Sequence, residues 1–201
     1  LQDVIREDAQ RIRAVREAVG ADADIYIDAN CSLDAYHAKR LVDMTRDCNL
    51  AFFEEPITQN DVHALRDLRQ STGMALAVGQ NEGLSFRFRD LLGAGAVDFV
   101  QPNVVISGGY TQCAKIAGMA EAFNTSIANG GAFPLHNMHL HAGLANGGRV
   151  EWHLVAVEMM NQLYLDTPRP HDGWLELPEA PGLGFEPNRD AIREIAKRSE
   201  E

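Results

Sequence analysis

The sequence predicts an α/β fold built as a (β/α) barrel, and three similar stretches carry that prediction. Each is a short apolar run, typical of a buried strand, that ends in oxygen-bearing side chains; the runs are 25–27, 50–53 and 74–78. Asp28, Glu54 and Gln80 follow these runs at a constant interval of 26 residues, which fits one strand, one helix and two short loops. Because parallel strands end at the same edge, these three side chains can converge on one hard cation.

Composition and charge narrow the class of protein. The 201 residues are 45% hydrophobic, which suffices for one sizeable core, and the net charge of −11 argues against nucleic acid or an anionic membrane surface as a partner. No apolar run of about 18 residues predicts a membrane span. The three cysteines lack C-x-x-C spacing, which disfavours a disulfide framework and favours a cytoplasmic location. The chain does not start with methionine, so we expect the natural N-terminus further upstream.

The first half of the chain alternates helices and strands. A helix is expected over 1–19, where apolar residues recur among charges and Gly20 can end it, and a strand follows at 24–28. Ser32-Leu33-Asp34 opens a helix over about 34–47, before the strand at 50–54. Asn60 or Asp61 can cap a helix that runs to about residue 71, with Val62, Leu65 and Leu68 at helical spacing. The third strand is expected at 75–79.

The second half continues the pattern with three more strands. We expect helices over about 85–92, 110–123 and 136–146, the last carrying His136, His139 and His141. The strands between and after them are expected at 96–101, 125–128 and 149–152. Residues 166–190 are rich in proline and glycine, and a final helix is expected over about 189–199.

This alternation predicts a parallel sheet with right-handed crossovers, and the regular period favours a barrel over an open doubly wound sheet. Neither G-x-G-x-x-G nor G-x-x-x-x-G-K-[ST] occurs, so nothing supports a nucleotide-binding fold. Six strands are present where a closed barrel has about eight, so we expect two strands and a further N-terminal part of roughly 150 residues upstream. Residues 1–160 are expected to form the partial barrel and 161–201 an extension outside it.

Several motifs occur together in the order found in one known family. They are Asp28-x-Asn30, Phe53-Glu54-Glu55-Pro56, Gly79 at a strand end, Ser107-Gly108-Gly109 and Pro181-Gly182-Leu183-Gly184. Each motif is weak alone, but the ordered set resembles the C-terminal barrel domain of the enolase superfamily, mandelate racemase and muconate lactonising enzyme branch, over nearly the whole chain. The resemblance implies a modified TIM barrel and a separate capping domain, toward which residues 161–201 would pack.

The resemblance also implies a Mg²⁺ site at the ends of three consecutive strands, with Asp28 and Glu54 as ligands. Hard carboxylate oxygens suit Mg²⁺, which keeps some waters for substrate to displace. The third position holds Gln80 where the family usually has Glu or Asp, and the amide oxygen of Gln80 can still coordinate the ion. Two alternatives stay open: Glu55 in place of Glu54, and Glu82 in place of Gln80.

The catalytic positions depart further from the family. Racemase-like members have an Asp, and lactonising members a Lys, where this chain has Asn103, and the position of the family's His falls at about Gly130. Neither Asn nor Gly takes a proton at neutral pH. Glu151 matches a family Glu near the substrate carboxylate, and His153 is expected on the same face of that strand. The alternative for His153 is a structural role as a half-buried polar residue at the barrel rim. For the three histidines between residues 136 and 141, positions on the protein surface are favoured over positions in the active site.

We therefore take Glu151, His153 and Asn103 as candidate catalytic residues and expect the general base to be a lysine upstream of this chain. The resemblance implies proton abstraction α to a carboxylate with an enediolate intermediate stabilised by Mg²⁺. With a base on one face only, dehydration of a sugar acid fits best. The alternatives are a racemase, epimerase or cycloisomerase of the same superfamily, or a non-catalytic homologue that binds. We also expect a homo-oligomer.

Overall fold

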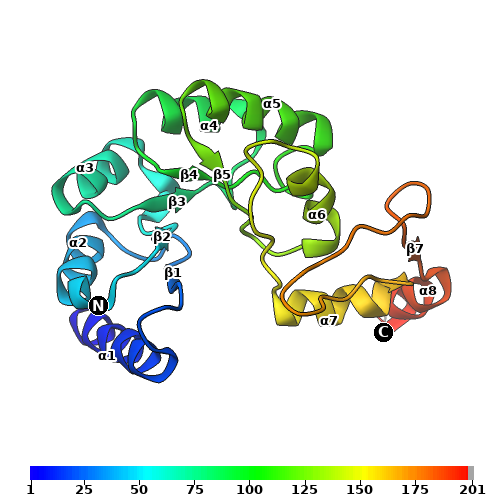
Figure 1. Cartoon of the computed structure of the whole chain (residues 1–201), viewed down its shortest axis with the longest axis horizontal. Helices are drawn as coiled ribbons and strands as arrows, with labels where there is room; N and C mark the ends of the chain where they lie inside the picture. Colours follow the sequence, from blue (N-terminus) through cyan, green and yellow to red (C-terminus); the bar gives the residue numbers. More distant parts are fainter. Residues whose placement is uncertain (199–201) are drawn as a thin grey trace.

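The main sheet of the structure, a computed structural model that describes residues 1–198, has five parallel strands. They are β1 (Tyr26–Asp28), β2 (Phe52–Glu54), β3 (Leu76–Val78), β4 (Phe99–Val100) and β5 (Ser126–Ile127), and they pair in sequence order. In Figure 1 these strands line the inside of an open arc, and helices cover its outside. The predicted parallel sheet of a partial (β/α) barrel is confirmed.

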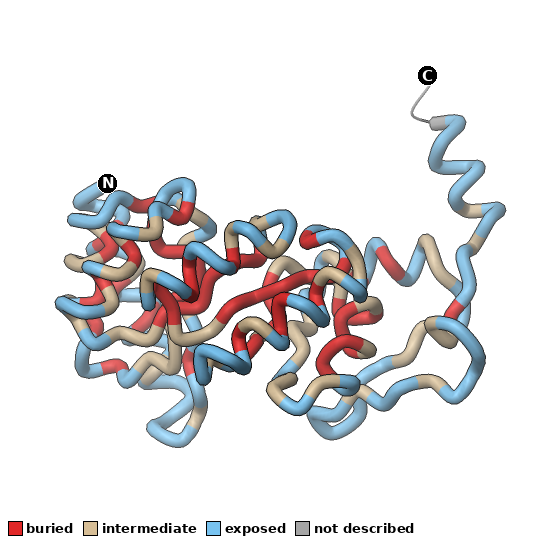
Figure 2. Tube along the Cα trace, turned by 90° about the horizontal axis from the view of Figure 1, so that it is seen from above, coloured by how far each residue is buried: buried red, intermediate tan, exposed pale blue. Residues whose placement is uncertain are grey.

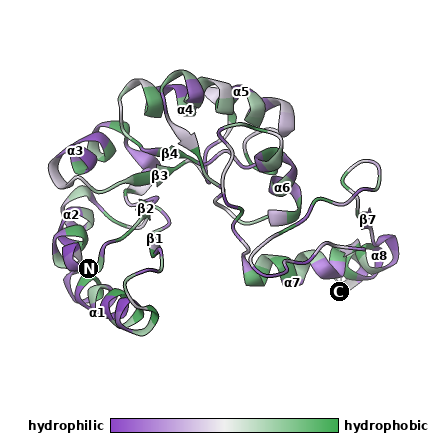
Figure 3. Ribbon diagram, in the orientation of Figure 1, coloured by the Kyte–Doolittle hydropathy of each residue, from purple (hydrophilic) through white to green (hydrophobic). Residues whose placement is uncertain are grey.

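Amphipathic helices follow the strands as the sequence predicts. They are α1 (Gln2–Val19), α2 (Ala35–Met44), α3 (Val62–Thr72), α4 (Leu84–Gly93), α5 (Tyr110–Ala122) and α6 (Pro134–Ala142), with 3₁₀ turns η1 (Arg46–Cys48) and η2 (Thr58–Asn60). Asp34 caps α2 and Asp61 caps α3, each accepting hydrogen bonds from backbone N–H groups of the first turn. Figure 3 shows hydrophobic and hydrophilic residues sharing each of the outer helices, as expected for helices with one buried face.

The main core lies between the sheet and these helices. Alternate strand residues such as Phe53, Leu76 and Val78 point outward into it and are almost fully buried. Figure 2 shows buried residues concentrated along the strands and the helix faces that meet them, whereas the segment leading to the C-terminus is mostly exposed. The strand ends that carry the candidate site are therefore held by a packed layer.

The inner face of the sheet carries a different set of side chains. Tyr26, Phe52 and Phe99 stack along it, with ring centroids 4.3 Å apart for the first pair and 5.5 Å for the second. Two residues further along their strands, Asp28 and Glu54 occupy the same face. An aromatic layer thus lies directly beneath the carboxylates.

The predicted sixth strand at 149–152 is wrong, because those residues form no strand. Gly147 and Gly148 precede the segment, and the N–H of Glu151 donates to the side chain of Asn129 at 2.9 Å instead of to a neighbouring strand. A four-residue alternation is too short a signal to establish a strand without a paired edge. The main sheet accordingly has five strands among the described residues, one fewer than predicted.

The chain then continues into elements that the sequence analysis missed. They are α7 (Leu154–Leu163) and the antiparallel pair β6 (Tyr164–Leu165) and β7 (Glu186–Pro187); α8 (Arg189–Arg198) matches the predicted last helix, whose residue 199 lies outside the described residues. Met160 and Phe185 join Leu135 and Met138 of α6 in a second, smaller core. The predicted boundary at residue 160 falls inside α7, and the division into barrel and extension stays a prediction. Within 1–198, no helix is both long and apolar enough to cross a membrane.

Of the three histidines of α6, His141 is buried, so its expected surface position is wrong, whereas His136 and His139 are half-buried. His136 contacts the rings of Tyr164 and Phe185, and His139 bonds to the carbonyl of Leu183. His141 is only 5% exposed: its Nδ1 accepts from the N–H of Gly148, and burial lowers its pKa to about 4. These side chains join α6 to neighbouring segments and do not line the candidate site.

Because the buried ring of His141 is neutral in the native protein, we expect the stability of the fold to fall in acid. The native protein resists protonation of this ring down to about pH 4, whereas the unfolded chain takes up the proton near pH 6.5. This contribution to stability is therefore complete above pH 6.5 and is lost as the pH falls toward 4. We expect about 2 kcal/mol of unfolding free energy to be lost through this residue between pH 7 and pH 5.

Urea denaturation at the two pH values, on wild type and on His141→Asn, measures this loss. The asparagine keeps an acceptor for Gly148 but does not titrate, so its pH dependence should be smaller by that amount. His63→Asn, on the exposed side of α3, serves as the matched control. Equal pH dependence in wild type and His141→Asn would contradict the prediction.

Candidate metal centre and its surroundings

The strand register brings the three predicted metal ligands to one edge of the sheet. Asp28 and Glu54 end β1 and β2 and are directly paired in the ladder, and Gln80 follows β3 by two residues. The amide of Gln80 reaches back to Asp28, donating from Nε2 to Oδ2 at 3.2 Å across 52 residues of sequence. The structure therefore confirms the predicted convergence of these side chains at the C-terminal ends of the strands.

Within the described residues 1–198, neither Asp28 nor Glu54 forms an ion pair with a positively charged side chain. Glu54 is 9% exposed, and its pKa is raised to about 8, first by burial and then by the charge of Asp28. Glu151 adds a smaller rise, and the amide of Gln101 opposes it. The pKa of Asp28 is also raised, chiefly by lost hydration, although part of the residue remains exposed. A cation placed between these groups would relieve both effects.

The two alternative ligands are engaged elsewhere. Glu82 forms an ion pair with Arg87, at 2.9 Å, and accepts from Asn60. Glu55 is fully buried and turned away from Glu54 by a left-handed backbone conformation, φ 41°. Of the five acidic or amide side chains considered, Asp28, Glu54 and Gln80 form the set in which Asp28 lies beside both of the others.

Glu55 instead ties together the loops that follow three strands. Its carboxylate accepts hydrogen bonds from the N–H of Gly79 at 2.8 Å, from the amides of Asn60 and Asn81 at 3.0 and 3.1 Å, and from the thiol of Cys31. Truncation would leave these donors unpartnered around a cavity. We expect Glu55→Ala to lower the free energy of unfolding by about 3 kcal/mol or more.

Chemical denaturation of the variant beside Glu121→Ala, an exposed glutamate on α5, tests this role. The thiol offers a second readout, because burial, followed by the contact with Glu55, raises the pKa of Cys31 to about 12. Cys31 should react slowly with alkylating reagents in wild type and faster in Glu55→Ala. If Glu55→Ala has the same free energy of unfolding as the Glu121→Ala control, Glu55 does not stabilise these loops.

Asn103 organises the loop that faces the ligands. It is fully buried, and its Nδ2 lies 2.8, 3.1 and 3.2 Å from the carbonyl oxygens of Gly130, Gly131 and Ala132. Its Oδ1 accepts from the N–H of Val105 at 3.0 Å. Because both polar atoms of the Asn103 side chain are used in this way, the residue holds the loop in place. A catalytic role for Asn103 remains a prediction.

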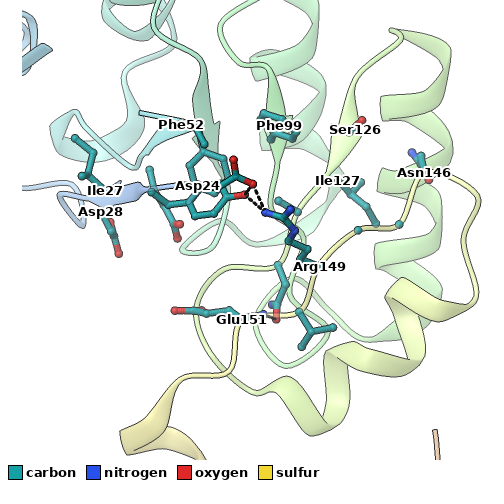
Figure 4. A pocket seen from close by; sticks show the side chains of 18 of the residues that line it. Asp24, Ile27, Asp28, Phe52, Phe99, Ser126, Ile127, Asn146, Arg149 and Glu151 are labelled. Atoms are coloured by element: carbon teal, nitrogen blue, oxygen red, sulfur yellow. Dashed lines mark hydrogen bonds and ion pairs between the residues drawn. The ribbon is translucent and has the colours of Figure 1, made fainter. Parts of the chain in front are cut away.

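The remaining two candidates differ in their surroundings. Glu151 lines a cavity of about 740 Å³ together with Asp28 and Glu54, and its Oε2 accepts from the N–H of Ala132 at 2.9 Å. Figure 4 shows Asp28 and Glu151 beside this cavity, together with an ion pair between Asp24 and Arg149 among the lining side chains. His153 is exposed and caps α7 through Nδ1. Strand alternation no longer places it beside Glu151, because no strand is there.

The donor set fits a hard divalent cation. Two carboxylates and an amide present only oxygen ligands once the Gln80 amide turns its oxygen inward, and a half-turn of that amide exchanges Nε2 with Oε1. Among the described residues no group of three or more His, Cys, Asp or Glu is arranged to hold a metal, so the amide of Gln80 is needed to complete the set. The burial of the Glu54 carboxylate, which raises its pKa, also favours a bound cation.

One residue of the site was missed in the sequence analysis. Gln101 follows β4 and is fully buried next to Glu54. The available signal was the same as for the ligands, namely a polar side chain that directly ends an apolar run, here Ala96 to Val100. It was overlooked because the interval from Gln80 to Gln101 is shorter than the 26-residue period.

The fold and the site define a (β/α)-barrel domain with an oxygen-ligand centre at the C-terminal ends of its strands. Comparison with known proteins identifies the family of this domain. The family model for the enolase C-terminal domain-like proteins matches residues 2–191. The chain belongs to that family, in the mandelate racemase and muconate lactonising enzyme branch of the enolase superfamily.

Three relatives illustrate the similarity. The chain is 31% identical over 187 residues to an L-rhamnonate dehydratase of Saccharopolyspora erythraea, and 30% identical over 185 residues to a D-xylonate dehydratase of Haloferax volcanii. These matches cover 89% and 90% of this chain but 48% and 45% of the relatives, so the chain spans about half their length. A mandelate racemase/muconate lactonizing enzyme from a marine actinobacterium, solved in complex with magnesium, superposes with a TM-score of 0.84 at 32% identity, covering 94% of this chain and 54% of that one.

Proposed function

We propose that this chain provides the metal-binding side of an active site that dehydrates a sugar acid with the help of Mg²⁺. The observation that carries the proposal is the convergence of Asp28, Glu54 and Gln80, with the pKa of Glu54 raised by burial without a positive partner. Relatives named as rhamnonate, xylonate and arabinonate dehydratases support the substrate class. A magnesium-bound structural neighbour supports the identity of the ion.

Each side chain has a defined task in this reaction. Asp28, Glu54 and the amide oxygen of Gln80 would hold Mg²⁺, which when bound stabilises negative charge developing on the substrate carboxylate. Glu151, on the wall of the same cavity, is the residue placed to assist departure of the β-hydroxyl as water. As neither Asn103 nor Gly130 can accept a proton, we assign the abstraction of the α-proton to a lysine outside this chain, as the family resemblance implies.

The function is tested on the complete enzyme, this domain together with the part that carries the proposed lysine, by offering it L-rhamnonate, D-xylonate and arabinonate with and without Mg²⁺. Dehydration converts the acid into a 2-keto-3-deoxy acid with loss of one water, and the new ketone is detected with semicarbazide. Exchange of the α-hydrogen in D₂O without loss of water would indicate a racemase or epimerase. Binding with neither reaction would indicate a non-catalytic homologue.

The charge of the metal site gives a further prediction. With both carboxylates ionised, the two carboxylates and one amide carry −2, and Mg²⁺ must also displace the proton that the raised pKa of Glu54 keeps bound near neutral pH. We therefore expect Mg²⁺ to bind loosely until a sugar-acid carboxylate adds charge and ligands, and we expect the metal and the acid to enhance each other's binding. Gln80→Glu should tighten Mg²⁺ binding about tenfold in the absence of substrate. It should also lower turnover, because a more negative site stabilises the developing charge less.

Calorimetric titration of Mg²⁺ into wild type and Gln80→Glu measures the first effect. Gln70→Glu, on an exposed position of α3, adds the same charge away from the site and should leave the affinity nearly unchanged. Equal affinities of wild type and Gln80→Glu would mean that Gln80 is not a ligand.

A further inference from the structure

The side chain of Asn129 holds the backbone of Glu151 in place. Asn129 follows β5 by two residues, is 7% exposed, and lines the same cavity as Glu54 and Glu151. Its Oδ1 accepts a hydrogen bond from the backbone N–H of Glu151 at 2.9 Å, across 22 residues of sequence. Because residues 149–152 form no strand, this side chain takes the place that a neighbouring strand would have in fixing that N–H.

The carboxylate of Glu151 is fixed at a second point. Its Oε2 accepts from the backbone N–H of Ala132 at 2.9 Å. Within residues 1–198, no other hydrogen bond to this carboxylate is present, so Oε1 is available to a molecule bound in the cavity. The contacts of Glu151 with Asn129 and with Ala132 together determine where this oxygen lies.

The loop 129–132, which makes both of these contacts, also packs against the proposed metal ligands. A methyl group built on Gly130 would lie 2.7 Å from Oε1 of Glu54, which shows how closely the loop approaches that carboxylate. One short loop therefore sets the position of Glu151 relative to Glu54. A general acid acts only within hydrogen-bond reach of the leaving oxygen, and a misplacement of about 1 Å can cost about 100-fold in rate.

We propose that Asn129 is a positioning residue for the dehydration: through the N–H of Glu151, it keeps Oε1 of that carboxyl group beside the β-hydroxyl of the bound sugar acid. This inference rests on the proposed function and deepens it, because it names the group that keeps Glu151 within reach of the leaving hydroxyl. Oε1 gives its proton to this hydroxyl, which leaves as water with the electron pair of the broken C–O bond. Asn129 acts through Glu151 and takes no proton itself.

The test uses the complete enzyme and whichever acid among L-rhamnonate, D-xylonate and arabinonate the wild type converts. Asn129→Leu keeps the size of the side chain but removes the acceptor, and we expect kcat to fall roughly 10- to 100-fold. KM and the Mg²⁺ affinity, the latter measured by calorimetry, should change less than about threefold, because the ligands keep their positions. Asn129→Asp retains an acceptor at the same atom and should turn the acid over faster than Asn129→Leu does.

Asn161→Leu is the matched control, because its exposed Oδ1 on α7 also accepts one hydrogen bond, from Thr167, away from the cavity. This variant should change none of the three values. Where Asn129→Leu does not fold, Asn129→Ala removes the same acceptor without adding a buried apolar group, and the same results are expected of it.

Amide hydrogen exchange reports on the contact itself, without substrate or metal. The N–H of Glu151 should exchange faster in Asn129→Leu than in wild type and in Asn129→Asp. A double-mutant cycle then tests the route of the effect on turnover. In a Glu151→Gln background, where the proton donor is already lost, Asn129→Leu should lower kcat no further.

Two results overturn the inference while the proposed function stands. One is an Asn129→Leu variant that converts the acid as fast as wild type does. The other is a loss of kcat in the Glu151→Gln background as large as the loss in wild type, which would mean that Asn129 does not act through Glu151. If the wild type converts none of the acids, the proposed function fails and this inference falls with it.

Discussion

Replacing Glu54 by glutamine is expected to weaken Mg²⁺ binding by about 100-fold or more. The substitution keeps the shape of the side chain but removes one of the two charges of the site, and Gln80 supplies none in compensation. The same change should leave the metal-free protein as stable or more stable, because a buried carboxylate whose pKa is raised by burial and by Asp28 is removed. Opposite effects on binding and stability distinguish a ligand from a structural residue.

Calorimetric titration of Mg²⁺ and urea denaturation in the presence of a chelator measure the two quantities. Glu121→Gln, on the exposed side of α5, removes the same charge at a distance and should change neither strongly. A Glu54→Gln variant that binds Mg²⁺ like wild type would rule out Glu54 as a ligand. A large loss of metal-free stability would show that the side chain holds the fold instead.

Replacing Asn103 by aspartate is expected to destabilise the protein by about 3 to 5 kcal/mol. The family resemblance implies an Asp at this position in racemase-like members, so the substitution introduces the residue of that group. In this structure, however, it would aim a carboxylate at the carbonyl oxygens of residues 130–132 in place of three donated hydrogen bonds. The acid would therefore release the loop and would not create a working base.

Urea denaturation and amide hydrogen exchange over residues 129–133 report on this change, with Asn124→Asp, in the exposed turn after α5, as the control. We expect faster exchange in the loop and weaker Mg²⁺ binding, because Gly130 and Gly131 pack directly against Glu54 and Gln80. An Asn103→Asp variant as stable as the control, with new proton-exchange activity, would contradict this assignment.

The sequence predicts the part of the fold that carries the proposed metal ligands well, because local signals agree there. The regular period, the apolar runs and the caps at Asp34 and Asp61 all indicate the same strands and helices, and the register then places Asp28 beside Glu54. Prediction fails between residues 149 and 187, where the segment 149–152 has the alternation of a strand but pairs with no strand in the structure, and where α7, β6 and β7 were not predicted. Pairing is a long-range property that a short pattern does not contain.

The roles of the buried polar residues were also beyond sequence reasoning. Asn103 was recognised by its position relative to the family, but its three carbonyl partners come from a loop 27 to 29 residues further along. Glu55 looked like a possible ligand until its donors were seen to come from three separate loops. Such contacts depend on exact backbone positions, which neither periodicity nor composition specifies.

The sequential strand order has a consequence for how this domain can diversify. The three proposed metal ligands lie in or directly after adjacent strands, β1 to β3, whereas Gln101, Asn103, Gly130 and Glu151 all come from later segments. Substitutions in the later block that preserve the loop contacts of Asn103 are expected to alter which molecule is accepted while the proposed ligands in the earlier block keep their positions. Such modularity allows chemistry to be exchanged by mutation in one half of the sequence without rebuilding the other.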